Sequence, residues 1–457
     1  MKALLVNPWI CDFAAYDLWL KPYGLLRAGT VLRDWGWSID LVDFLDRRDP
    51  ELPAYLSRPL PRNEPFGRGK FPKVPVEKPK AVAAVERPYF RYGLPRELAR
   101  KRLGEKARPD LILLGTTMTY WYPGYFQTLK LAGEFFPGVP VILGGLYPRL
   151  CPVHARARSG AEIVLTGGGR GELAAAIAGL GFPPPPPPDG DEVVPAYDLL
   201  RDRSALAVRT GLGCPHACSY CAAPLLEPEL RRRKPETVAA EVAGYRDRYG
   251  TTDIAFYDNA LLFDSGNHLD RILGLLIRSG VGLRFHTPNG LHARFLTART
   301  AELMKETGFV EPRLSLESAG EDRQERTGGK VSNRDLVRAL GLLEAAGFQR
   351  REVIVYLMIG LPGQALKEAE RDIRFVNSLG ASVSLAAYSP IPGTPDYLRL
   401  VREGEIPEDL DPVWQNNTVF PARRGLFPLE AIRGLRELAG RLNRELVKTD
   451  RMTPADR

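Results

Sequence analysis

The stretch RTGLGCPHACSYC, residues 209–221, decides how the rest of the chain is interpreted. Its cysteines, Cys214, Cys218 and Cys221, are spaced C-x₃-C-x₂-C and follow two glycines. The stretch comes directly after an apolar run at 205–209, which is typical of a buried strand. Barrels of parallel strands keep their chemistry on the loops at the carboxyl ends of the strands. The spacing therefore predicts a cofactor-binding loop at the mouth of such a barrel.

The number of clustered cysteines favours an iron–sulfur cluster. An ordinary ferredoxin cluster has four cysteine ligands, whereas three leave one iron open for catalysis. The alternative is a zinc ion with His216 as its fourth ligand. Structural zinc sites usually contain a second pair of ligands some distance away, and the two remaining cysteines, Cys11 and Cys151, stand alone. We therefore expect a [4Fe–4S] cluster at these three cysteines.

Composition and charge set broad limits. A chain of 457 residues is long for a single core and allows two domains with an appendage. Apolar residues make up 44% of the chain, no apolar run approaches the ~20 residues that cross a bilayer, and the first residues lack a signal-peptide pattern. These features predict a cytoplasmic protein. The net charge of +8 fits anionic cofactors or an arginine-rich composition as well as nucleic acid. The charge alone therefore does not indicate a nucleic-acid partner, and we expect none.

Residues 1–182 alternate short apolar runs with helical patterns. The apolar runs are Ala3–Asn7, Ile39–Phe44, Leu111–Gly115, Val139–Gly144 and Ile163–Thr166. Short, almost wholly apolar strands separated by helices are typical of a parallel sheet that is covered on both faces. The pattern predicts a Rossmann-like, doubly wound α/β domain of about five strands.

Two proline-rich stretches interrupt this alternation. Residues 48–108 contain many prolines and basic residues, and we interpret them as an insertion that forms a surface wrap or a cap over a binding site. Six consecutive prolines, Pro183–Pro188, predict a stiff spacer. We therefore expect a linker at residues 183–200.

Residues 201–395 repeat a strand–helix pattern with longer helices. The expected strands are Ala205–Arg209, Asp253–Tyr257, Gly282–His286, Arg313–Leu316, Val353–Met358 and Ser382–Tyr388. Six such units predict a partial (β/α)6 barrel, short of the usual eight. Residues 396–457 are expected to form a helical accessory region with an amphipathic helix near 429–447.

With Tyr220 just before its last cysteine, the 209–221 stretch resembles the signature of the radical S-adenosylmethionine (SAM) superfamily. Motifs at the other expected strand ends are similar to elements of that superfamily. They are YDN (257–259), PNGL (288–291), SLES (315–318), IGLPG (359–363) and PIPGT (390–394). The resemblance implies a [4Fe–4S] cluster that binds and reductively cleaves SAM to a 5′-deoxyadenosyl radical, which abstracts hydrogen from an unknown small-molecule or peptide substrate. It also implies an electron donor such as flavodoxin or ferredoxin.

The resemblance implies residues that contact SAM. They are Tyr220 on the adenine, Glu317 and Ser318 on the ribose or amino acid moiety, Gly360 as a point of close approach, and Asp258, Asn289 and Gln364. Many relatives have glutamate where Gln364 stands, so its role stays open. Purely structural alternatives exist as well: Glu317 pairs with Arg284 or Arg313, Asp258 caps the following helix, and Asn289 belongs to an ordinary turn.

The first domain resembles that of the cobalamin-binding radical SAM enzymes. The resemblance rests on TTMTYWY (116–122), GGLY (144–147) and TGGGRGE (166–172), which follow the third, fourth and fifth expected strands. The implied cobalamin-binding residues are Thr117, Tyr120, Trp121, Gly144, Gly145, Tyr147 and Gly168. None of the five histidines stands in an Asp-x-His-x-x-Gly motif, so a histidine ligand to cobalt is not expected.

If cobalamin binds, the resemblance implies methylation of an unactivated carbon. The alternatives are a cobalamin-independent radical SAM enzyme whose first domain binds substrate, and a non-catalytic iron–sulfur or cobalamin carrier. The methylthiotransferases of transfer RNA are also similar, but they need three further cysteines, and Cys11 and Cys151 are only two.

Overall fold

The computed structural model describes residues 1–56, 59–61, 63–183, 193–424 and 427–449, and the chain folds into two compact units. The first unit contains residues 1–203 together with 409–416, and the second contains 204–408 and the chain from Asn417 onward. Most of the predicted proline spacer, residues 184–192, lies outside the described residues. Among the described residues, no helix is long and apolar enough to cross a membrane.

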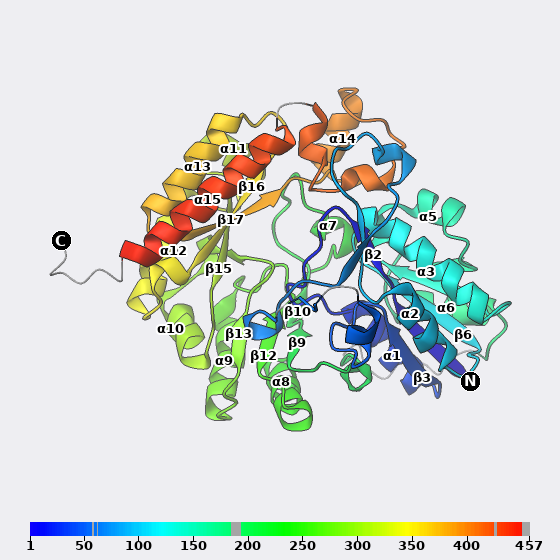
Figure 1. Ribbon diagram of the computed structural model, residues 1–457. Helices are drawn as coiled ribbons and strands as arrows, with labels where there is room; N and C mark the ends of the chain where they lie inside the picture. The colour runs from blue at the N-terminus through cyan, green and yellow to red at the C-terminus, as the bar shows by residue number, and fades with distance from the viewer. Residues whose placement is uncertain (57–58, 62, 184–192, 425–426, 450–457) are drawn as a thin grey trace. The chain divides into compact units, whose positions relative to one another are not determined.

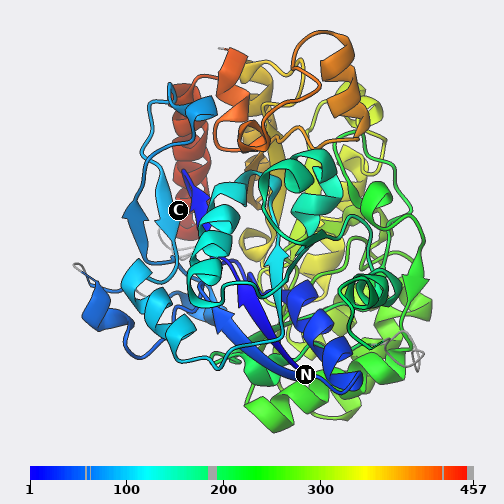
Figure 2. The ribbon, with the colours of Figure 1, turned by 90° about the vertical axis from the view of Figure 1, so that its right-hand side faces the viewer.

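The first unit is built on a five-stranded parallel sheet (Figures 1 and 2). Its strands, in spatial order, are β3 (Ser38–Asp43), β1 (Lys2–Asn7), β6 (Leu111–Thr116), β7 (Val141–Gly145) and β8 (Ile163–Val164). Its helices are α1 (Tyr23–Asp34), α2 (Arg96–Gly104), α3 (Tyr122–Phe135), α4 (Leu146–Leu150), α5 (Pro152–Arg158) and α6 (Arg170–Gly179). Leu5 pairs in register with Leu41 on one side and Leu113 on the other, so apolar side chains fill the sheet centre. The predicted Rossmann-like, doubly wound arrangement is confirmed.

The stretch 48–108 is more regular than its prolines suggest. It contains β4 (Lys73–Pro75) and β5 (Phe90–Tyr92), which pair antiparallel with β2 (Ile10–Asp12) in a separate three-stranded sheet. Helix α2 then leads back to β6 as an ordinary crossover. The two strands were missed because each is only three residues long and surrounded by prolines.

The residues just after the proline spacer pack on the first unit. Val193, Ala196, Tyr197 and Leu200 are buried, and the Thr30 hydroxyl on α1 donates a 2.7 Å hydrogen bond to the Val194 carbonyl. The second half of the expected 183–200 linker is thus held by apolar side chains that a free spacer would expose.

The second unit contains seven parallel strands. One sheet has β9 (Ala205–Val208), β12 (Asp253–Phe256) and β13 (Arg284–His286). The other has β14 (Leu291–His292), β15 (Arg313–Glu317), β16 (Ile354–Ile359) and β17 (Ser382–Ala387). The six predicted strands are all present and the partial-barrel arrangement is confirmed, with the two-residue β14 as an addition.

Long helices follow the strands of the second unit and cover them. They are α8 (Pro235–Tyr249), α9 (Leu269–Arg278), α10 (Ala298–Thr307), α12 (Asn333–Ala345) and α13 (Leu366–Ser378). Helix α12 begins with a capping box in which Ser332 and Asp335 bind each other's backbone N–H groups. The tail helix α15 (Leu429–Thr449) packs on β17 and α13, as the red ribbon in Figure 1 shows. The units therefore each present the carboxyl ends of parallel strands, where the predicted site residues lie.

Candidate functional site

The loop with the three cysteines is anchored by a carboxylate that the sequence analysis did not identify. Glu227 accepts hydrogen bonds from Arg209 Nη2 at 2.6 Å, from the Gly213 N–H at 3.1 Å and from Asn259 Nδ2 at 2.9 Å. Arg209 and Asn259 follow β9 and β12, and Gly213 directly precedes Cys214. Glu227 therefore fixes the start of the cysteine loop to the ends of two strands.

Gly213 has no room for a side chain. Its φ angle is +80°, and a Cβ atom there would lie 2.4 Å from the Glu229 carbonyl oxygen. Glycine adopts this left-handed conformation without the steric cost that other residues carry. The glycine before the first cysteine is thus required by the backbone turn.

The three thiols of the loop are buried to different degrees. Cys218 is buried and Cys214 and Cys221 are partly buried. Burial raises the pKa of all three thiols above the usual value, and the charge of nearby Lys330 opposes that rise. Lys330 thus favours the thiolate form, which is the form that binds metal.

His216, the fourth ligand of the zinc alternative, packs among other rings. Among the described residues, no three Cys, His, Asp or Glu side chains gather closely enough to hold one metal ion. The His216 ring packs on His292 and Phe295, with ring centroids 5.2 and 5.5 Å apart. The thiolates of a [4Fe–4S] cluster bind different irons and therefore stand farther apart than ligands that share one ion. The choice of a cluster over zinc therefore rests on the number and spacing of the cysteines.

A second loop, TGGK (327–330), packs against the cysteine loop. The Ser219 N–H donates to the Thr327 carbonyl at 3.3 Å, and a Cβ on Gly328 would lie 3.2 Å from Cys218 Cα. Lys330 is nearly buried, and its Nζ lies 2.6 Å from Glu317 Oε1 and 5.7 Å from the Tyr220 ring centroid. Although burial alone would lower it, the Glu317 charge raises the pKa of Lys330. Sequence analysis missed Lys330; the adjacent glycine pair was the available signal.

Glu317 occupies an unusual backbone conformation. Its φ angle is +71°, and the pairing of β15 with β16 shifts register between Ser315 and Glu317. Positive φ is uncommon outside glycine and marks local strain, which concentrates at functional sites. The sequence-based alternative that Glu317 pairs with Arg284 or Arg313 is wrong, because Lys330 is its partner. Arg284 pairs with Asp253, and Arg313 with Glu311, through bonds of their own.

Other expected SAM-binding residues are tied to their neighbours. The buried Asp258 carboxylate accepts from Thr210 Oγ1 at 2.7 Å, so it does not cap the following helix. Burial raises the pKa of Asp258, and the bonds from Thr210 oppose this effect. Asn289 Nδ2 donates to the carbonyls of Tyr257 and Asp258. These contacts close the strand ends around the cysteine loop.

Ser318, Gln364 and Gly360 have structural partners as well. Ser318 Oγ donates to Asp372 Oδ2 at 2.8 Å. Gln364 uses both ends of its amide, accepting from the Leu361 N–H and donating to the Met358 carbonyl. Gly360 has φ +75°, and a Cβ there would lie 2.5 Å from Pro421 Cβ. Gly360 therefore allows close packing of Pro421, which sequence analysis did not anticipate.

In the first unit, the ends of β6 and β7 are joined at the predicted glycines. Thr116 Oγ1 donates to the Gly144 carbonyl at 2.8 Å, and the Thr117 N–H donates to the Tyr125 hydroxyl at 3.0 Å. Gly145 has φ +109°, and a Cβ there would lie 2.1 Å from the Thr116 carbonyl oxygen. The strand end therefore needs glycine at residue 145 for its own close packing.

The aromatic residues expected to face cobalamin are instead buried in the first unit. Tyr120, Trp121 and Tyr147 are 6%, 7% and 0% exposed. The exposed apolar side chains on these loops are Met118 and Leu146, at 42% and 36%. Gly168 and its neighbouring glycines are also exposed. The large rings are thus part of the core, and the flexible side chains of Met118 and Leu146 are the ones left accessible to a ligand.

His154 is held within an aromatic cluster. Its Nδ1 lies 2.6 Å from the Tyr147 hydroxyl, and its ring packs on Tyr122 and Phe126. Burial lowers the pKa of His154 below the usual value. Its position is explained by packing within the first unit.

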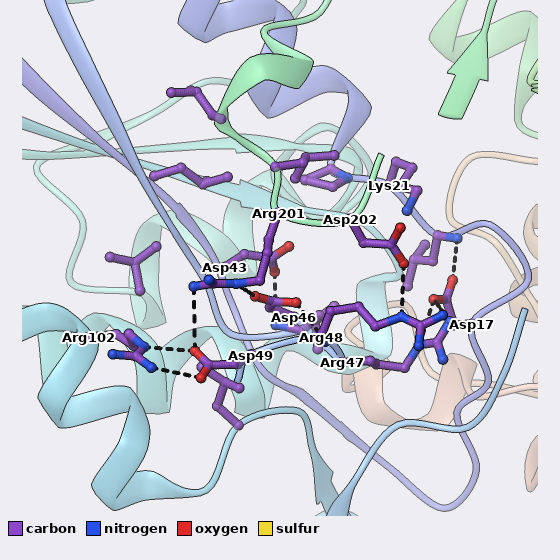
Figure 3. Close-up of a pocket in the computed structure, with 18 of the residues that line it drawn as sticks. Asp17, Lys21, Asp43, Asp46, Arg47, Arg48, Asp49, Arg102, Arg201 and Asp202 are labelled. Carbon is purple, nitrogen blue, oxygen red and sulfur yellow. Dashed lines mark hydrogen bonds and ion pairs between the residues drawn. The ribbon is translucent and has the colours of Figure 1, made fainter. Parts of the chain in front are cut away.

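The first unit also contains a charged cavity of about 190 Å³ at the carboxyl end of β3 (Figure 3). Figure 3 shows ion pairs across its lining. They join Arg47 to Asp17 at 2.8 Å, Arg48 to Asp202 at 3.1 Å, Arg201 to Asp46 at 2.9 Å and Arg102 to Asp49 at 2.7 Å. Burial and the neighbouring Asp46 raise the pKa of Asp43 to about 6. The cavity brings together balanced charges and none of the predicted site residues.

Comparison with known proteins gives a family match. Residues 208–376 match the model of the radical SAM superfamily, whose members use a [4Fe–4S] cluster and SAM. Two curated proteins with the name tRNA-2-methylthio-N(6)-dimethylallyladenosine synthase are similar at 25% identity. The protein of Kineococcus radiotolerans matches over 201 residues, 41% of this chain and 38% of its own length. The protein of Anaplasma phagocytophilum matches over 260 residues, 54% and 55%. The chain thus spans about half or less of these relatives.

Solved structures match over a larger share of the chain. One of them is TsrM from Kitasatospora setae, a radical SAM methyltransferase with tryptophan and a SAM analog bound. Its TM-score is 0.63 at 16% identity, and the match covers 88% of this chain and 76% of the TsrM chain. OxsB, a cobalamin-dependent SAM radical enzyme with aqua-cobalamin and SAM bound, gives a TM-score of 0.53 at 14% identity and covers 88% and 55%. At these identities the likeness establishes a shared fold.

Proposed function

We propose that this chain, a radical SAM enzyme through its domain at residues 208–376, holds a [4Fe–4S] cluster on Cys214, Cys218 and Cys221. The observation that carries the proposal is the loop itself. It presents three thiols on a backbone that Glu227 fixes to the ends of β9 and β12. Three cysteine ligands leave one iron of a cluster for SAM.

The surroundings of the three cysteines fit such a group. Two buried ring nitrogens, His216 Nε2 and His292 Nδ1, have no hydrogen-bond partner in the described part of the chain. Buried polar atoms of this kind usually have a partner, which a bound group or water can supply. Lys330, whose side chain is 12% exposed, adds a positive charge that lowers the pKa of all three thiols. Polar donors and a compensating cation thus surround the proposed cluster.

The cofactors would supply the bond-breaking chemistry, and the chain would bind and orient them. A bound, reduced cluster would supply the one electron needed to break the sulfur–C5′ bond of SAM, with methionine and a 5′-deoxyadenosyl radical as the products. We assign Tyr220, Glu317 and Ser318 to SAM binding. The Lys330–Glu317 pair presents one cation and one anion beside Tyr220, which is complementary to the zwitterionic methionine part of SAM.

We further propose that the first unit binds cobalamin and that the reaction is methylation of an unactivated carbon. The loops after β6, β7 and β8 support this, because they expose Met118, Leu146 and the glycines around Gly168. Doubly wound sheets bind ligands at this edge, and the TsrM and OxsB structures of the same fold contain cobalamin. Cobalamin would supply the methyl group. No histidine of this chain stands in the motif that ligates cobalt.

The proposed reaction balances with SAM as both radical source and methyl donor. The substrate R–H, two SAM molecules and two electrons give R–CH₃, methionine, 5′-deoxyadenosine and S-adenosylhomocysteine. The hydrogen atom taken from the substrate ends in 5′-deoxyadenosine. The electrons come from an external one-electron donor of the flavodoxin or ferredoxin class.

A transfer-RNA methylthiotransferase reaction is less well supported. Cys11 and Cys151 are both buried, and burial raises the pKa of each thiol to about 12. Such thiols are poorly disposed to bind metal. The chain also spans only part of those relatives.

Anaerobic reconstitution with iron, sulfide and hydroxocobalamin tests both parts of the proposal. We expect about four irons and four sulfides per chain, retained cobalamin after gel filtration, and 5′-deoxyadenosine after reduction with SAM. Stoichiometric zinc without iron absorption would end the radical SAM assignment. If the cluster is loaded but no cobalamin is retained, the radical SAM proposal stands and the cobalamin proposal is refuted.

A further inference from the structure

A short segment from far along the chain completes the first unit. Residues 409–416, here called the strap, group with residues 1–203 and contain the 3₁₀ helix η9 (Pro412–Gln415). Gln415 and Asn416 at its end are 1% and 0% exposed. Two adjacent amide side chains with so little exposure require hydrogen-bond partners nearby.

Gln415 connects the loops that follow β6 and β7. The Thr119 hydroxyl, on the 3₁₀ helix η4 (Thr119–Trp121) after β6, donates to Gln415 Oε1. Cys151, at the junction of α4 and α5 after β7, lies with its Sγ 3.6 Å from Gln415 Nε2 and 3.8 Å from Oε1. One side chain therefore bridges both loops of the proposed cobalamin edge.

Asn416 acts on the same loop through a buried carboxylate. Asp12 on β2 accepts hydrogen bonds from Asn416 Nδ2 at 2.8 Å and from Trp121 Nε1 at 2.6 Å. Asp12 is 2% exposed, so its carboxylate depends on these donors. At the other end of the strap, the Tyr122 hydroxyl donates to Asp411 Oδ2 at 3.3 Å. The strap thus holds the β6 loop at three points along its length.

The loops that the strap holds carry the exposed apolar side chains of this edge. Met118 directly precedes η4, and Leu146 begins α4. A rigid, flat ligand binds best when the groups on both sides of it are already held in place, because ordering loops on binding lowers affinity. A residue that fixes the distance between two such loops therefore affects affinity without touching the ligand.

We propose that Gln415 is a positioning residue for cobalamin, which sets the spacing of the Met118 and Leu146 loops by bridging Thr119 and Cys151. The inference rests on the proposed function, since it concerns the same cobalamin edge. It assigns a role to residues near position 415, more than 250 positions beyond the loops they hold.

The test uses the full chain and a double-mutant cycle. Gln415→Met removes both polar contacts at similar volume, and Thr119→Val removes the hydroxyl from the opposite side. We expect each variant to bind hydroxocobalamin about tenfold more weakly by equilibrium dialysis, as loss of one buried polar link predicts. The double variant should be weakened by less than the product of the two single effects, because both changes break the same bond.

A matched control separates positioning from general loss of stability. Asn443→Leu removes an amide that bonds the N–H and carbonyl of Val383 in the second unit. We expect it to lower the melting temperature as Gln415→Met does but to leave cobalamin affinity unchanged. Iron content should be the same in all variants.

The outcomes are distinguishable. A wild-type chain that retains no cobalamin overturns the cobalamin function and this inference with it. If the wild type binds and Gln415→Met binds equally well, or if the two single effects multiply in full, the function stands and the role of Gln415 is refuted.

Discussion

The strand ends of the two units differ in what they leave exposed. In the second unit, polar strand-end side chains bind one another and Glu227, while the cysteine loop carries nucleophilic sulfur atoms. In the first unit, large aromatic residues at the strand ends are buried, and Met118 and Leu146 are exposed in their place. The proposed cluster would be held by covalent bonds at one edge, and the proposed cobalamin by shape and apolar contact at the other. The reactive sulfur atoms can be located from the spacing of cysteines in the sequence. An apolar binding surface cannot, because it depends on which side chains remain exposed after the core has packed.

The largest effect should come from the cysteine loop. Cys218→Ala should abolish iron binding and 5′-deoxyadenosine formation, since two thiolates do not complete the ligand set. Iron analysis and product chromatography after anaerobic reconstitution check this. Cys11→Ala, which removes a buried thiol of the first unit, should keep its iron. If Cys218→Ala retained iron at the wild-type level, the cysteine loop would not be the site of the cluster.

The anchor of the cysteine loop should have the next largest effect. Glu227→Ala leaves the Gly213 N–H and Arg209 without their carboxylate, so we expect a loss of about 1–3 kcal/mol in stability and a faster loss of iron to a chelator. Glu229→Ala, at an exposed neighbouring pair with Arg231, should change stability by less than about 0.5 kcal/mol. Equal iron-loss rates for the two variants would show that Glu227 does not hold the loop.

Much of the second unit could be predicted from sequence, because β9, β12 and β16 are nearly continuous apolar runs and the three cysteines share one loop. Glu227, Lys330 and Gln415 could not be predicted in the same way. Each is an ordinary polar residue whose role depends on contacts made only after folding, as when Lys330 meets Glu317. The burial of Tyr147 could not be predicted either, because a large ring near a glycine turn fits both a ligand site and a core.

Lys330 provides an electrostatic test of the cluster edge. Lys330→Met should make the cluster harder to reduce, because a buried cation stabilises the more negative reduced state. Glu317→Gln should shift the midpoint potential in the opposite direction. A redox titration monitored by electron paramagnetic resonance, without SAM, measures both shifts. Lys305→Met, whose ammonium instead lies over the Phe348 ring, should leave the potential unchanged. Shifts of the same sign in the two site variants would contradict this assignment.

The smallest expected effect concerns the carboxyl end of β3 in the first unit. The pKa of Asp43 is raised to about 6, so between about pH 4 and 6 the folded chain holds a proton that the unfolded chain has released. Stability from this group is greatest below pH ~4 and is lost as the pH rises through ~6. Asp43→Asn should remove this dependence, on the order of 1 kcal/mol, in melts across that range.

An exposed carboxylate provides the comparison for that series. Asp247→Asn, on a side chain that is 61% exposed, should follow the wild-type pH profile. If Asp43→Asn also follows the wild-type profile, Asp43 is not the group that titrates.

The strap has a consequence for how this architecture can be exchanged between proteins. Because residues 409–416 complete the first unit, a contiguous fragment that ends at Arg203 would lack Gln415, the partner of Thr119, and Asn416, one of the two side-chain donors to Asp12. Recombination that replaces only the N-terminal part would leave the old strap facing new loops. Exchange of the first unit between proteins therefore has to include both residues 1–203 and the strap. We expect substitutions near Thr119 to covary with substitutions at Gln415.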